Sequence, residues 1–296
     1  MRHYERLSDE QLLATELEIS NPESLEGLVD AVPEGDDEVF VEFSYAGDQE
    51  HRCVHQHHRH KKGYVMRKGD ARFRVGWMCA RELYGVEAFA KFEAEFKAAV
   101  QRRRGLLRRR EIEQRLLAIM RFIENEVGGE TVREFDRVSR EIGRLPFVSG
   151  RYAPRFGLAA TSDLFFDPLL ADVSKKLREL QQSKASAEQA LARLKPWLRD
   201  LVPEVEDVIF RLELLVDFFQ PAMLMAICAE ANKRDAPDRR TYEPGLMSLT
   251  CHRVGATKIV ITLSPTYRPP DRTRFAELIA EFNALGTGNN LSAEAA

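Results

Sequence analysis

A helical periodicity of unusual length is the sequence feature that most constrains the fold. From Cys79 the chain can continue as helix to Val127, because apolar residues recur about every 3.6 positions until Gly128-Gly129 ends the pattern. The apolar positions are Phe89, Phe92, Phe96, Val100, Leu107, Ile112, Leu116, Ile119 and Ile123. The pattern predicts a mainly α protein built on long helices.

A second helical region carries a coiled-coil-like seam over residues 173–201, whose seam positions alternate four and three apart. These positions are Val173, Leu177, Leu180, Lys184, Ala187, Leu191, Leu194, Leu198 and Leu201. Three interpretations stay open: the seam pairs with other helices of the same chain, it forms a homodimer, or it pairs with another protein. We expect Pro196 and Pro203 to break or kink the helix, because proline lacks the N–H and clashes with the preceding turn.

The remaining patterns divide the chain into segments. Ser8 and Gln11 form a predicted capping box of a short helix. Period-two alternation predicts a strand at 38–45, a hairpin of 63–67 with 71–75, and a second hairpin near the C-terminus. The expected segments are an acidic arm with a short helix (1–37), a small α+β zinc module (38–90), a long basic helix and a short helix (91–144), a linker loop (145–168), a helical or coiled-coil region (169–232), a β-hairpin plus helix (241–285) and a disordered tail (286–296).

Potential metal ligands are concentrated near the start of the chain. Four of the seven histidines lie between residues 55 and 60, directly after Cys53. Cys79 follows at a predicted helix start, where the helix dipole is expected to lower the pKa of its thiol. Zinc takes four Cys or His ligands in a tetrahedron, and a tight turn, a hairpin and a helix start can supply them together. Gly76 is expected to allow a close approach of the backbone to the metal.

This order of elements resembles a treble-clef type zinc module found in uncharacterised bacterial and phage proteins, over about residues 38–90. The matching positions are Val75, Gly76, Cys79, Ala80 and Gly85. The resemblance implies zinc binding and no reaction. It departs at position 56, where Gln replaces a second cysteine, so histidines must substitute. Spacing favours Cys53, His57, His60 and Cys79 as ligands, with His55 and His58 as alternates.

Charge is segregated along the chain. The first 50 residues are strongly acidic, whereas residues 51–115 carry 18 Lys or Arg against 7 Asp or Glu. Six arginines fall within residues 102–110, and Arg72 with Arg74 share one face of a predicted strand that we expect to be exposed. The predicted phosphate contacts are Arg72, Arg74, Arg102, Arg103, Arg104, Arg108, Arg109 and Arg110. In the alternative interpretation, the acidic arm folds over this basic surface.

We therefore expect a non-enzymatic, zinc-binding protein that associates with nucleic acid through a basic helix. The alternatives are a coiled-coil protein-interaction scaffold with a structural zinc, and a metal-dependent hydrolase. The hydrolase is disfavoured because Asp70 is the one acidic residue between residues 51 and 80. Four cysteines in 296 residues and no long apolar run favour a cytoplasmic protein that does not enter a membrane.

Overall fold

The computed structural model describes residues 3–145, 166–235 and 240–285. About 59% of the chain is helical and 20% is strand. The protein is thus mixed α and β, with more sheet than the mainly α class predicts. It divides into two compact units, and the division falls after Glu111, inside one long helix. The expected linker at 145–168 and the expected tail lie almost entirely outside the described residues.

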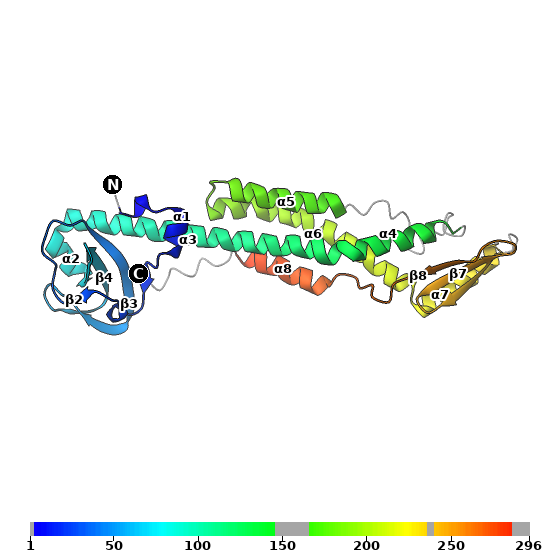
Figure 1. Ribbon diagram of the computed structural model, residues 1–296, viewed down its shortest axis with the longest axis horizontal. Helices are drawn as coiled ribbons and strands as arrows, with labels where there is room; N and C mark the ends of the chain where they lie inside the picture. Colours follow the sequence, from blue (N-terminus) through cyan, green and yellow to red (C-terminus); the bar gives the residue numbers. More distant parts are fainter. Residues whose placement is uncertain (1–2, 146–165, 236–239, 286–296) are drawn as a thin grey trace. The chain divides into compact units, whose positions relative to one another are not determined.

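The first unit contains a short helix, a sheet and two further helices (Figure 1). The predicted Ser8 capping box is confirmed, since Ser8 accepts from the Gln11 N–H and the Gln11 side chain accepts from the Ser8 N–H. The elements are η1 (His3–Arg6), α1 (Asp9–Ala14), β1 (Glu18–Ile19), η2 (Pro22–Ser24), β2 (Leu28–Val29), β3 (Val39–Arg52), β4 (Arg59–Lys68), β5 (Ala71–Gly76), α2 (Trp77–Tyr84) and α3 (Val86–Phe122).

The sheet of this unit has the order β1-β3-β4-β5-β2. Its centre is the antiparallel β3-β4-β5 meander, which confirms the predicted strand and hairpin. The outer strands β1 and β2 pair in parallel with β3 and β5, and both come from the acidic arm. Met66 and Phe73 of the meander belong to the same apolar core as Phe89 and Phe96 of α3.

The second unit packs helices with a small sheet. The C-terminal strands form a three-stranded antiparallel sheet, β6-β7-β8, where a two-stranded hairpin was expected. The elements are the end of α3, the π-helical turn η3 (Ile123–Val127), α4 (Gly129–Gly143), α5 (Phe166–Gln182), α6 (Ala187–Phe218), α7 (Pro221–Asp235), β6 (Arg240–Gly245), β7 (Ser248–Arg253), β8 (Ile259–Thr262) and α8 (Arg272–Ala284).

The coiled-coil-like seam is divided between two helices. It is interrupted at residues 183–186, where Ser186 caps α6, and α5 and α6 pack against each other within the unit (Figure 1). Its apolar members lie in the core of the second unit: Val173, Leu180, Ala187, Leu191, Leu194, Leu198 and Leu201 are buried there. Packing within the chain therefore accounts for the periodicity.

Two prolines lie inside α6 instead of ending it. Pro196 and Pro203 are both exposed, so the carbonyl groups that they leave without an intrahelical partner face the solvent side. In the described part of the chain, no single helix is long and apolar enough to cross a membrane. Only α6 and α7 together reach that length and apolarity, across a bend of 74°.

Candidate functional site

Two buried cysteines meet between the sheet and α2. Cys53 follows the last residue of β3, and Cys79 lies in the first turn of α2. Their side chains are hydrogen-bonded to each other, and the Gln56 backbone N–H donates to the Cys79 sulfur. Burial raises the pKa of the Cys79 thiol to about 11, and Cys53 and Glu82 shift it in the same direction. The lowered pKa expected at this helix start is therefore wrong, because burial of the thiol is the largest cause of the shift.

The turn after β3 is fixed by backbone and side-chain bonds. Cys53 N–H donates to the His58 carbonyl, and Val54 N–H donates to the Arg74 carbonyl. Gln56 lies three residues after Cys53, and its side-chain amide donates to the Glu82 carboxylate at 2.6 Å. Glu82 in turn lies three residues after Cys79. Gln56 and Glu82, each three residues after a cysteine, thus hydrogen-bond to each other and link the turn to α2.

The histidines take different environments. His57 and His58 are exposed, His55 is half-buried, and the His60 Nε2 atom hydrogen-bonds to the Tyr45 hydroxyl. Among the described residues, no group of three or more His, Cys, Asp or Glu side chains is placed to hold a metal ion. The structure therefore brings the two predicted sulfur ligands together and leaves the predicted imidazole ligands apart from them.

A buried polar cluster next to the cysteines was not predicted. Tyr45 is 3% exposed and His51 is 2% exposed, and their rings meet edge to face with centroids 5.2 Å apart. The His51 Nε2 and His60 Nδ1 atoms are buried without a hydrogen-bond partner. Burial lowers the pKa of both imidazoles.

Two glycines leave space for the side chains of this cluster. They are the sequence feature from which the cluster could have been predicted. Gly63 and Gly76 oppose each other across β4 and β5. A Cβ at Gly63 would lie 2.6 Å from the Tyr45 hydroxyl, and a Cβ at Gly76 would lie 3.2 Å from the His60 ring. We expected Gly76 to let the backbone approach a metal. It instead leaves room for the His60 imidazole.

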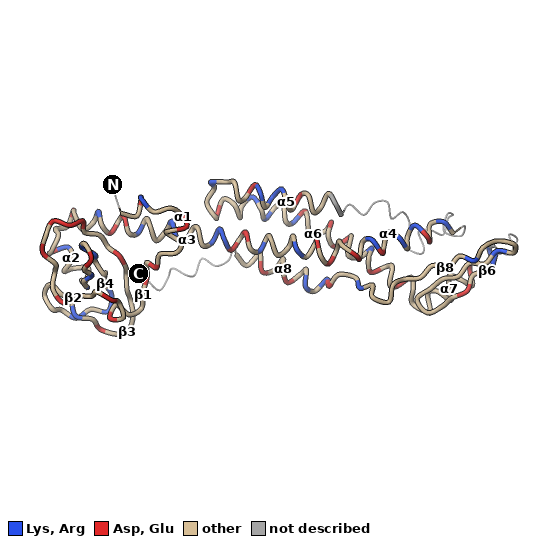
Figure 2. Tube along the Cα trace, in the orientation of Figure 1, with Lys and Arg blue, Asp and Glu red and all other residues tan. Residues whose placement is uncertain are grey.

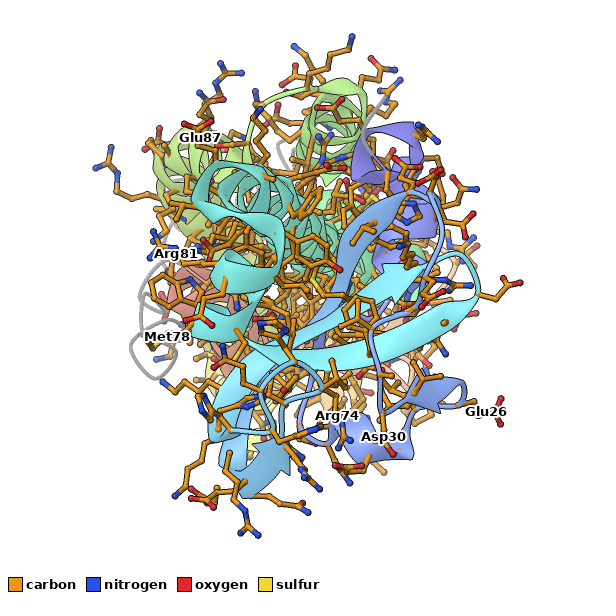
Figure 3. All side chains as sticks on the ribbon, turned by 90° about the vertical axis from the view of Figure 1, so that its left-hand side faces the viewer. Glu26, Asp30, Arg74, Met78, Arg81 and Glu87 are labelled. Atoms are coloured by element: carbon orange, nitrogen blue, oxygen red, sulfur yellow. The ribbon has the colours of Figure 1, made fainter. Side chains whose placement is uncertain are left out.

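The expectation that Arg72 and Arg74 form an exposed basic face is wrong. Their strand alternates as predicted, but the acidic arm covers the face that they share. Arg74 is 6% exposed and pairs with Glu23 and Asp30, the latter at 3.0 Å (Figure 3). Arg72 binds the Glu42 carboxylate through two nitrogens, at 2.7 and 2.8 Å. Strand alternation predicts which face a side chain takes, but not which segment covers that face.

Two arginines of α3 also contact the acidic arm. Arg102 pairs with Asp9 at 2.5 Å, and Arg104 pairs with Glu18 at 2.6 Å. Arg108 and Arg109 have partners of their own, and the Arg103 Nε atom is buried. Acidic and basic positions are intermixed in this unit (Figure 2). These contacts agree with the interpretation in which the acidic arm folds over the basic surface.

Other basic side chains near the Cys53 turn are exposed to solvent. Arg52 and Lys61 are exposed and have no ion pair within the part of the chain that the structure describes. Arg59 is 78% exposed, and its pair with Glu50, at 3.7 Å, is loose. These three side chains, next to the exposed imidazoles of His57 and His58, form what we call the cationic turn: Arg52, Arg59 and Lys61.

Comparison with known proteins adds no assignment: no protein family, no curated protein and no solved structure matches this chain.

Proposed function

We propose that this chain is a non-enzymatic nucleic-acid-binding protein whose first unit is held by a zinc ion at Cys53 and Cys79. One observation carries the proposal: the two sulfurs that join β3 to α2 hold the base of the cationic turn. The turn then presents its positive charges outward, as phosphate binding requires. Of the six predicted α3 arginines, Arg102 and Arg104 contribute less, because the acidic arm already neutralises them.

The chemistry of the cysteine pair supports zinc. Two adjacent sulfurs, one of which accepts a hydrogen bond from an amide N–H, can become thiolate ligands when zinc displaces their protons. Zinc there supplies a structural cross-link between the turn and α2. The remaining ligands are proposed to be His57 and His60, with His55 and His58 as alternates. His60 must leave Tyr45 to serve, and the exposed turn histidines must move inward.

The zinc proposal predicts about one zinc per purified full-length chain, measured by mass spectrometry of metal content. We expect Cys53→Ser and Cys79→Ser each to abolish this zinc, because each removes a thiolate. Zinc occupancy should also fall as pH is lowered, since protons compete with the metal for the thiols. Cys228→Ser and Cys251→Ser, which alter buried cysteines of the second unit, are the matched controls. Equal zinc content in all four variants would contradict the zinc site.

The nucleic-acid proposal predicts binding that weakens steeply between about 50 and 200 mM salt. Fluorescence anisotropy with labelled single-stranded DNA of about 20 nucleotides measures it. Removing the cations together in Arg52→Ala/Arg59→Ala/Lys61→Ala should reduce the slope of log affinity against log salt by roughly 2, because each lost phosphate contact removes about 0.7.

Two further variants decide which cations act. Arg102→Ala/Arg104→Ala should lower the stability of the first unit and leave the salt slope unchanged, because these arginines contact the acidic arm. Arg193→Ala/Arg199→Ala removes two exposed arginines of α6 and should change neither quantity. A salt slope that the cationic turn variant leaves unchanged would refute the proposed role of the turn.

A further inference from the structure

An exposed tryptophan opens α2 beside the cysteine pair. Trp77 is 44% exposed, and the Arg81 guanidinium lies over its ring, 4.5 Å from the centroid. The indole also hydrogen-bonds to the Glu93 side chain. Glu93 is itself held by the Tyr64 hydroxyl at 2.7 Å and by Lys97 at 3.0 Å. The ring is thus fixed in orientation while much of its surface stays open to solvent.

Packing within the unit does not explain this exposure. The neighbouring Met78 is 68% exposed and Val86, at the start of α3, is 56% exposed. Figure 3 shows Met78 and Arg81 on the same short helix. Exposed apolar side chains beside a planar cation are typical of a recognition surface.

The tryptophan is connected to the cationic turn. The bond from Gln56 to Glu82 ties the turn to α2, and the contact of Cys53 with Cys79 ties it to the same helix. The first helical turn of α2 therefore carries both the sulfur that anchors the cationic turn and the exposed ring. Phosphate-binding cations and an aromatic surface are the two components of single-strand recognition.

We propose that Trp77, together with Arg81, is a stacking platform for an unpaired base of a single-stranded nucleic acid. The proposal rests on the proposed function and specifies its ligand class. An indole face and a guanidinium plane both stack on nucleobases. Because Glu93 and Arg81 already fix the ring, a base can stack without ordering a mobile side chain. Duplex DNA, whose bases are stacked on one another, offers this platform no free base face.

The test uses the fluorescence of Trp77. The chain has two tryptophans, so Trp197→Phe in the full-length protein leaves Trp77 as the reporter. Titration with oligothymidylate of about 20 nucleotides should quench this fluorescence. An abasic oligomer of the same length offers phosphates without bases and should bind more weakly without quenching. In the wild-type background, Trp77→Ala should weaken binding of labelled oligothymidylate roughly 5- to 150-fold.

Controls separate this proposal from the function on which it rests. Trp77→Phe keeps an aromatic face and should retain most of the affinity, and an unchanged thermal unfolding curve shows that the variant folds. Oligothymidylate binding that Trp77→Ala leaves unchanged would overturn the stacking platform but not nucleic-acid binding. Absence of binding to any oligonucleotide would overturn both. Stronger quenching by polyglutamate than by oligothymidylate would also overturn it and favour an acidic protein partner.

Discussion

Replacing Gly63 with alanine is expected to destabilise the first unit by about 3 kcal/mol, the upper range for an overpacked core. The new Cβ would lie 2.7 Å from the Val75 carbonyl oxygen and 2.6 Å from the Tyr45 hydroxyl. The first of these atoms is backbone of the paired strand, so it cannot move without disturbing β5. The second belongs to a buried ring that is hydrogen-bonded to His60.

Urea unfolding followed by circular dichroism measures this loss. Gly105→Ala is the matched control, because a Cβ there meets nothing within 4 Å. Gly105 lies inside α3, where alanine is favoured over glycine by about 1 kcal/mol, so this variant should be slightly more stable than the wild type. Equal stability of the two variants would show that Tyr45 and β5 do not pack as described.

The second large effect concerns the buried guanidinium of Arg74. We expect Glu23→Ala/Asp30→Ala to cost about 3 kcal/mol, because it leaves a buried charge without its partners. The reverse change, Arg74→Met, should cost less than about 1 kcal/mol. The two carboxylates are 42% and 94% exposed, so water can solvate them once the arginine is gone. Burial lowers the pKa of Arg74, in agreement with its 6% exposure.

Denaturant unfolding of the three proteins tests this asymmetry. Glu16→Ala/Glu34→Ala is a suitable control, since it removes two exposed carboxylates of the same acidic arm. A loss for Arg74→Met as large as that for the double carboxylate variant would mean that the ion pairs themselves stabilise the unit.

Local signals predicted much of the fold. The capping box at Ser8, the β3-β4-β5 meander and the long helix α3 each follow from neighbouring residues, which is why the sequence predicts them. Strands β1 and β2 were missed because each has two residues and lies among prolines and glycines. Strand β6 was missed because Pro244-Gly245 reads as a turn, although both residues pair with β7. These elements depend on partners that are distant in sequence.

For the candidate site, spacing predicted the meeting of Cys53 with Cys79. It did not predict that His60 would bind Tyr45, because that contact depends on the space left by two glycines of neighbouring strands. The prediction that Arg72 and Arg74 form an exposed basic face was wrong for a related reason. Whether an arginine meets a phosphate or a carboxylate of its own chain depends on which segment crosses the strand, and residue spacing carries no information about that.

The parallel strands β1 and β2 cap both sides of the meander although they lie only nine residues apart in sequence. An open strand edge is a template for pairing with another molecule. One short stretch near the start of the chain therefore covers part of both edges, at Ser44-Tyr45 and at Arg72-Phe73. A chain without this stretch would expose the edges of both β3 and β5. Its loss is therefore expected to favour aggregation, and it would also remove acidic residues that balance the basic ones.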